Sequence, residues 1–180
     1  PGSGRIFIDS FPLSKLDTQI VTRFSNGIAC DFLQKDCNKN DFFYTIRANT
    51  AIIGGPSAGA GTTVITIAAL EGLQLDDSVI MTGTINSGGL IGPVGGVEEK
   101  IKAAQGAGFE KVLIPKWTFK ENQTLNKSGF DIEIIEVSSI EEAVFHFTGK
   151  DYSRPEREIQ VPDKYVEVMK GIAKDLCERS

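Results

Sequence analysis

The chain has 180 residues, a formal net charge of −5 and a pI of about 5.0. Apolar residues make up 41% and charged residues 24% of the sequence, which excludes a disordered chain and indicates a soluble globular domain with a buried core. The acidic balance argues against nucleic acid as a partner, and a single His with three Cys argues against a metal site.

The pattern of apolar residues, interrupted by Gly and Pro, predicts strands that alternate with helices. We expect strands at residues 5–10, 42–47, 50–53, 78–85, 111–114 and 131–137. We expect helices at residues 15–33, 57–71, 97–107, 138–147 and 163–178. The second helix is apolar on all sides and should be buried, and the fourth should begin with a capping box of Ser138 and Glu141. This alternation indicates an α/β (or α+β) fold.

The last thirty residues differ in pattern from the rest. Residues 1–150 are expected to form the domain, and residues 151–180 a linker and a C-terminal helix. The apolar stripe of this helix should pack on the same domain through Val166, Met169, Ile172, Ala173 and Leu176. Cys30 and Cys37 are close enough in sequence to be bridged, although reduced thiols are the interpretation we favour. Because the first residue is Pro, we expect a processed form or an excised piece.

A serine lies between a predicted strand and the predicted buried helix, in the segment GPSAG at 55–59. The glycines permit a sharp turn, and Ser57 falls at a helix N-terminus, where free N–H groups favour negative charge. A tetrahedral oxyanion could be held by the turn formed by Gly55, Pro56, Ser57 and Ala58, but Pro56 has no N–H and a second donor must come from elsewhere. The simplest alternative is that Ser57 only caps the helix.

Two other chemistries compete for the same segment. The letters G-x-S-x-G match the nucleophile turn of α/β-hydrolases with a Ser-His-Asp triad. That triad needs His146, which falls off the apolar stripe of its predicted helix and should face solvent. No G-K-[ST] ending follows, so the segment is not a P-loop. The Gly-rich loop of a GHMP-type kinase, a nucleotide-binding transferase, is a weak match because its companion motifs are missing. The remaining interpretation is a Ser–Lys pair.

Lys100 is the one charged residue that the predicted helix at 97–107 turns toward the core. Its helical neighbours three and four positions away include no acid, so the helix itself supplies no counter-charge. Burial without a counter-charge disfavours the ammonium form, and a neutral amine can accept the proton of a serine hydroxyl. The alternative is a lysine whose amine extends into solvent. Thr82 could hold the amine through its hydroxyl, or could simply pack in its strand.

Several segments between residues 51 and 116 resemble, in order and spacing, the proteolytic domain of Lon proteases: GPSAG at 55–59, MTG at 81–83, GPVGGVEEK at 92–100, AA at 103–104 and VLIP at 112–115. The resemblance implies a serine endopeptidase with Ser57 as nucleophile and Lys100 as general base. It implies that Thr82 contacts the lysine. It also implies an α/β fold, polypeptide substrates and a homo-oligomer in the form of a hexameric ring.

The sequence also departs from that family. No Walker motif is present, so ATP is expected only through a separate ATPase module or partner, and no cofactor is expected in this chain. The serine follows fewer residues than in the family, so we expect a leading hairpin to be missing, and residues 9–44 match loosely. Archaeal Lon-like proteases without the ATPase are the more similar group, which leaves cytoplasmic, membrane-associated and exported locations open. A non-catalytic Lon-like module for assembly or peptide binding is the alternative function.

Overall fold

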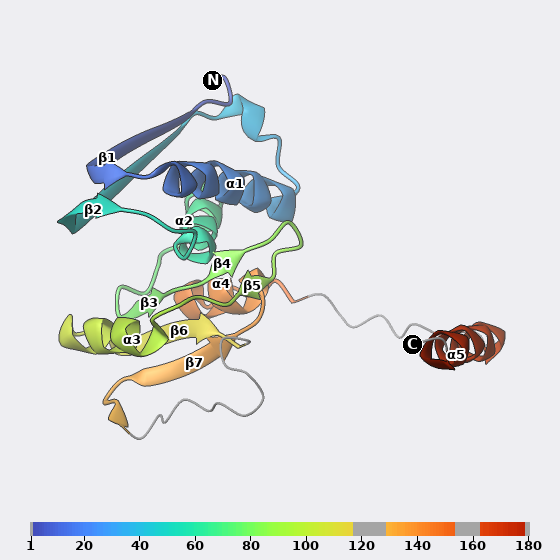
Figure 1. Ribbon diagram of the computed structural model, residues 1–180. Helices are drawn as coiled ribbons and strands as arrows, with labels where there is room; N and C mark the ends of the chain where they lie inside the picture. The colour runs from blue at the N-terminus through green and yellow to red at the C-terminus, as the bar shows by residue number, and fades with distance from the viewer. Residues whose placement is uncertain (1, 117–128, 154–162, 179–180) are drawn as a thin grey trace.

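The computed structural model describes residues 2–116, 129–153 and 163–178 (Figure 1). Strands and helices alternate along the chain, which confirms the α/β (α+β) class. In chain order, they are β1 Ile6–Ser14, α1 Leu16–Leu33, a 3-10 helix Cys37–Lys39, β2 Phe42–Ile53, α2 Gly59–Glu71, β3 Val79–Met81, β4 Thr84–Ile85, β5 Ile91–Gly92, α3 Val97–Gly106, β6 Lys111–Pro115, β7 Glu133–Val137, α4 Ile140–Thr148 and α5 Asp163–Glu178.

A parallel sheet in the order β3-β6-β7 forms the centre of the domain, with helices on both faces (Figure 1). The central strand β6 is buried on both sides, as expected for a parallel sheet, and its residues alternate between two cores. Val112 and Ile114 pack with α3, whereas Leu113 packs in the larger core with α2 and α4. The sheet therefore fixes α3 on the face opposite α2.

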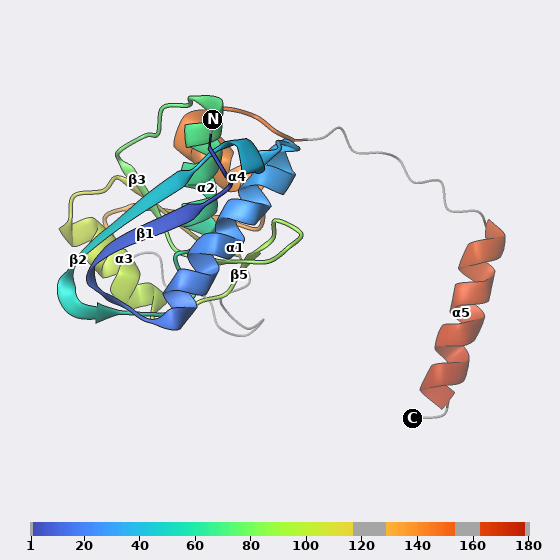
Figure 2. The ribbon, with the colours of Figure 1, turned by 90° about the horizontal axis from the view of Figure 1, so that it is seen from above.

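The N-terminal part of the chain is a second layer, formed by the parallel pair β1 and β2 with α1 as the crossover (Figure 2). Helix α1 packs against α2 with Ile28 and Ala29 in the larger core. The outer face of the strand pair is exposed and carries both apolar and charged side chains: Phe7 stacks on Phe43 with ring centroids 4.7 Å apart, and Arg47 pairs with Asp9. This layer supports α2 from the side away from the central sheet.

The strands differ from the prediction in several places, and the short strand β5, which pairs antiparallel with β4, was not predicted. β1 continues beyond residue 10 to Ser14, because its register shifts between Phe11 and Leu13 and so accommodates Pro12. The two expected strands at 42–47 and 50–53 form the single strand β2. The expected strand at 78–85 is divided into β3 and β4 by Thr82 and Gly83, which turn toward α2.

Two helix predictions also need correction. α2 begins at Gly59 rather than at residue 57, and it is not buried all round, because Ile65 is 45% exposed. The capping interaction of α4 lies one residue later than predicted: the Ser139 hydroxyl accepts from the Glu142 N–H at 3.4 Å. Ser138 instead donates from its N–H to the Glu142 carboxylate at 2.8 Å. The pattern identified the cap, and the choice between two adjacent serines was wrong.

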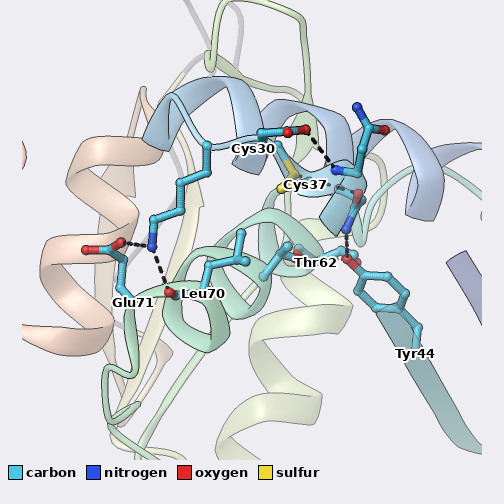
Figure 3. The surroundings of a disulfide bond; sticks show 11 residues. Cys30, Cys37, Tyr44, Thr62, Leu70 and Glu71 are labelled. Atoms are coloured by element: carbon cyan, nitrogen blue, oxygen red, sulfur yellow. Dashed lines mark hydrogen bonds and ion pairs between the residues drawn. A yellow bond between two sulfur atoms is a disulfide. The ribbon is translucent and has the colours of Figure 1, made fainter. Parts of the chain in front are cut away.

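Cys30 and Cys37 form a disulfide, so the favoured interpretation of reduced thiols is wrong (Figure 3). α1 ends at Gln34 in the left-handed conformation, and this reversal brings the two cysteines together. The bridge fixes the C-terminal end of α1 to the 3-10 helix that precedes β2.

The apolar stripe of α5 is not seen packed on the domain. Met169 and Ile172 are 47% and 49% exposed, and Figure 2 shows α5 apart from the other elements. An amphipathic pattern indicates that the apolar side of a helix is buried against another surface, but it does not identify that surface. Residues 154–162 of the expected linker and the side chain of Leu176 lie outside the described part of the chain. Among the helices that are described, none is both long and apolar enough to span a membrane.

Candidate active site

Ser57 lies in the tight turn between β2 and α2, two residues before the first residue of the helix. Gly55 has a φ of +97°, which a residue with a side chain rarely adopts. Its N–H donates to Asp17 Oδ2 at 2.8 Å, and the Gly59 N–H donates to the Pro56 carbonyl at 3.0 Å. The turn therefore presents Ser57 at the start of a helix that is firmly packed in the core.

A second segment, between β3 and β4, holds the backbone of Ser57 from the opposite side. The Gly83 N–H donates to the Ser57 carbonyl at 2.9 Å, and the Ala60 N–H donates to the Gly83 carbonyl at 3.1 Å. A side chain at Gly83 would place its Cβ 2.6 Å from Ile91 Cγ2, so only glycine allows this approach. This pair of backbone bonds fixes Ser57 relative to Thr82, the residue that precedes Gly83.

The side chain of Lys100 extends from the first turn of α3 to Thr82, beside Ser57. Its Nζ donates to Thr82 Oγ1 at 3.2 Å, and the Thr82 hydroxyl donates in turn to the Ser57 carbonyl at 3.4 Å. Thr82 is only 7% exposed, and the two bonds that it makes are partly buried. The hydroxyl of Thr82 thus connects the lysine to the backbone of the serine.

The surroundings of Lys100 favour its neutral form. The side chain is partly buried, and this loss of water lowers the pKa of Lys100 below the ordinary lysine value. Within the described ranges, no carboxylate forms an ion pair with it, in contrast to Lys35, Lys39, Arg5 and Arg47. A positive charge here would be stabilised by one hydroxyl and by no acid.

A cavity of about 340 Å³ opens beside these three residues. Apart from Ser57, Thr82 and Lys100, its lining is apolar and comes mainly from β3, α3 and β6: Ala58, Ile80, Met81, Ala103, Ala104, Ala107, Phe109 and Val112. The small alanines of α3 leave room for a side chain of a bound molecule. The cavity can therefore take an apolar group next to the serine hydroxyl.

The structure brings Ser57, Thr82 and Lys100 together around this cavity. Among the described residues, however, no hydrogen bond joins Ser57 Oγ to Lys100 Nζ, and the amine donates to Thr82 instead. His146 lies at the C-terminal end of α4 and lines another cavity with Gln74 and Lys111, so it is not placed beside Ser57. The Ser-His-Asp alternative is therefore not supported.

The residues expected around the oxyanion have different roles. The Gly55 N–H is occupied by Asp17, and Pro56 has no N–H. The N–H groups of Ser57 and Ala58 have no hydrogen-bond partner within residues 2–116 or the other described ranges. These two donors at the start of α2 are the ones available to an anion.

Sequence reasoning missed two residues of α1 that hold the turn. Asp17 binds the Gly55 N–H, and the buried Ser25 hydroxyl donates to the Gly59 carbonyl at 2.9 Å. Both lie far from Ser57 in sequence, and no local pattern marks them. In the parts of the chain that are described, no group of three or more His, Cys, Asp or Glu residues could hold a metal ion.

Comparisons with known proteins show the family that the chain resembles. Residues 33–148 match the family model of the Lon protease (S16) C-terminal proteolytic domain. The chain is 40% identical to Lon protease 2 of Bacillus subtilis over 51% of its length and 16% of that protein. It is 40% identical to the archaeal Lon protease of Archaeoglobus fulgidus over 52% of its length and 15% of that protein.

A longer match extends over nearly the whole chain. It is 28% identical to the Lon protease of Methanosarcina barkeri over 92% of its length and 21% of that protein. The chain thus spans only about a fifth or less of the length of these curated relatives. The family model covers more than half of the chain, and the matched residues contain Ser57, Thr82 and Lys100. The chain belongs to the family of Lon protease (S16) C-terminal proteolytic domains.

Proposed function

We propose that this chain is a serine endopeptidase domain that hydrolyses peptide bonds of polypeptide substrates, with Ser57 as nucleophile and Lys100 as general base. The observation that carries the proposal is the lysine amine, which is partly buried, forms no ion pair with an acid among the described residues and donates to Thr82 beside Ser57. Most surface lysines pair with acids or water, and their ammonium groups cannot accept a proton. A neutral amine can.

The proposed reaction begins with transfer of the Ser57 hydroxyl proton to Lys100 Nζ as Ser57 Oγ attacks the carbonyl carbon of the substrate. The amine must move from Thr82 toward Ser57 for this step, or share its hydrogen bonds between them. The protonated Lys100 then gives its proton to the leaving amine of the substrate. Water hydrolyses the acyl-enzyme, with Lys100 again acting as base.

The start of α2 is proposed to stabilise the oxyanion of this reaction. The N–H groups of Ser57 and Ala58 are the donors without a partner in the described ranges, and the helix dipole adds a favourable field. The adjacent apolar cavity would receive a substrate side chain. In the described sheets β2 pairs only with β1, so its second edge could bind an extended substrate segment by main-chain hydrogen bonds.

A fluorophosphonate probe tests this function directly, because its phosphorus forms a bond with an activated serine Oγ as fluoride leaves. We expect labelling at Ser57 by mass spectrometry, together with cleavage of an unstructured polypeptide such as casein. Ser57→Ala should lose both, while far-UV circular dichroism stays unchanged. Casein cleavage at an undiminished rate in Ser57→Ala would contradict the proposal.

A second candidate is a non-catalytic module for assembly or peptide binding, and one observation favours it. Ser57 Oγ and Lys100 Nζ are not hydrogen-bonded to each other in the described structure. Absence of labelling in wild type, measured also on any oligomer separated by size-exclusion chromatography, would support this candidate. The same chromatography tests the expected hexameric ring, and addition of ATP tests for dependence on a separate ATPase.

A further inference from the structure

The segment that carries Ser57 is held at both ends by α1 and by Lys15, the residue that precedes it, and neither lines the cavity. On the N-terminal side of the segment, the Lys15 N–H donates to the Ile53 carbonyl at 2.9 Å, and Asp17 Oδ2 accepts from the Gly55 N–H at 2.8 Å. On its C-terminal side, Ser25 Oγ donates to the Gly59 carbonyl at 2.9 Å. In the sequence, Ser57 lies midway between Gly55 and Gly59, which make the last two of these contacts.

The contact made by Asp17 is the only one of the three that uses an ionised side chain. One carboxylate oxygen accepts from the Thr18 N–H at 2.7 Å, in the first turn of α1, where the helix dipole favours a negative charge. The other oxygen is left for Gly55. The carboxylate is therefore held on its own helix as well as bound to the turn, and the bond to Gly55 is charge-assisted although it is exposed to solvent.

Gly55 is a position in the turn that no neighbouring side chain packs against. Its φ is +97°, and a Cβ added there would meet no neighbouring atom within 4 Å, so packing does not hold this residue. The N–H bond to Asp17 is therefore its principal constraint. The Ser57 backbone, by contrast, is fixed by the Gly83 N–H. Loss of the Asp17 bond would let the turn pivot about Ser57 and change the direction of its Oγ.

We infer that Asp17 is a positioning residue for the nucleophile, which acts through the Gly55 N–H and does not touch the substrate. This inference depends on the proposed function. By binding Gly55, Asp17 also keeps that N–H away from the oxyanion and leaves the donors of Ser57 and Ala58 for it. A shift of the nucleophile by about 1 Å can lower a rate by about a hundredfold.

The experiment compares Asp17→Ala and Asp17→Asn with wild type in the full chain. We expect Asp17→Ala to lower the rate of Ser57 labelling by the fluorophosphonate and the kcat for a fluorogenic peptide by ten- to about a hundredfold, with KM within about twofold. Asp17→Asn retains one oxygen acceptor and should recover part of the rate. Asp31→Ala is the matched control. Asp31 is an exposed acid on the same helix, and its side chain has no described hydrogen bond.

Amide hydrogen exchange at Gly55 provides a readout that is independent of activity. Its exchange should be faster in Asp17→Ala and protected again in Asp17→Asn. The inference is overturned if all variants label at the wild-type rate, if the loss lies in KM alone, or if Asp17→Asn protects Gly55 without recovering any rate. If wild type itself is not labelled, the proposed function fails; if wild type is labelled and Asp17→Ala is equally fast, only this inference fails.

Discussion

The two ends of α2 each lie near a lysine from another part of the chain, and the two lysines have opposite surroundings. At the C-terminal end, Lys35 Nζ lies 2.6 Å from Glu71 Oε1 and donates to the Leu70 carbonyl at 2.9 Å (Figure 3). Near the N-terminal end, Lys100 Nζ donates to a hydroxyl and pairs with no described acid.

This difference decides what each amine can do. At Lys35 the ion pair acts on the acid: the hydrogen bond from Lys35 lowers the pKa of Glu71. At Lys100, where no described acid pairs with the amine, partial burial lowers the pKa of the lysine itself. The lysine of an ion pair and the lysine proposed as the base thus lie near opposite ends of one helix, and the following variants test the contrast.

The largest effect is expected from Lys100→Met paired with Lys35→Met. Loss of the base should lower peptide cleavage by about 10³-fold in Lys100→Met, whereas Lys35→Met should retain at least about half of the activity. Their effects on stability should be reversed: calorimetry should show an equal or higher Tm for Lys100→Met and a lower Tm for Lys35→Met. Equal losses of activity in the two variants would remove the contrast.

Thr82→Val should have the next largest effect, because it retains the shape of the side chain and removes the hydroxyl that binds Lys100. We expect kcat to fall by about tenfold, in line with the loss of one hydrogen bond to a charged or reacting group. Thr82→Ser is the control and should remain near wild type. If Thr82→Val is as active as Thr82→Ser, the hydroxyl does not orient the amine.

Removal of the disulfide tests a feature close to Lys35 and far from Lys100. Replacement of Cys30 and Cys37 by Ser should lower the free energy of unfolding by about 2 kcal/mol, since the bridge closes a short loop. Denaturant unfolding measures this loss, and reducing agent should produce the same loss in wild type. Labelling of Ser57 in the folded variant should be unchanged. Identical unfolding with and without reductant would show that the bridge is not formed.

The smallest effect is expected from Glu71→Gln. The pair with Lys35 is partly exposed, so its removal should cost less than about 1 kcal/mol at neutral pH. Because the folded pKa of Glu71 is lowered, its contribution is present above the unfolded value and is lost as pH falls through the folded value. Stability curves of Glu71→Gln and wild type should therefore converge in acid. A stability difference between Glu71→Gln and wild type that stays constant as pH falls would contradict this role of the pair between Glu71 and Lys35.

The sequence was sufficient to predict the elements that carry the site, because their signals are local. The glycines around Ser57 mark the turn, and the 100° spacing of helical residues places Lys100 at the edge of the apolar face of α3. The motif at 81–83 placed Thr82 near the lysine, and the structure has its hydroxyl at 3.2 Å from Nζ. These predictions required only periodicity and the resemblance.

Long-range contacts were not predictable in the same way. The bond from Asp17 to Gly55 joins residues 38 positions apart, and no pattern in either segment indicates it. The disulfide joins residues only seven positions apart, but it depends on the left-handed residue Gln34 at the end of α1, which the sequence pattern does not indicate. The exposed side of α2 was missed because a run without charge indicates apolar surroundings but does not show which neighbours supply them.

The most direct test of the central claim is the pH dependence of Ser57 labelling by the fluorophosphonate in wild type and Lys100→Met. A lowered pKa means that the amine loses its proton below the ordinary lysine range, so the wild-type rate should rise in one step as pH increases, with its midpoint below that range. Lys100→Met should be slow and lack this step. A rate in Lys100→Met with the same step as wild type would contradict the account.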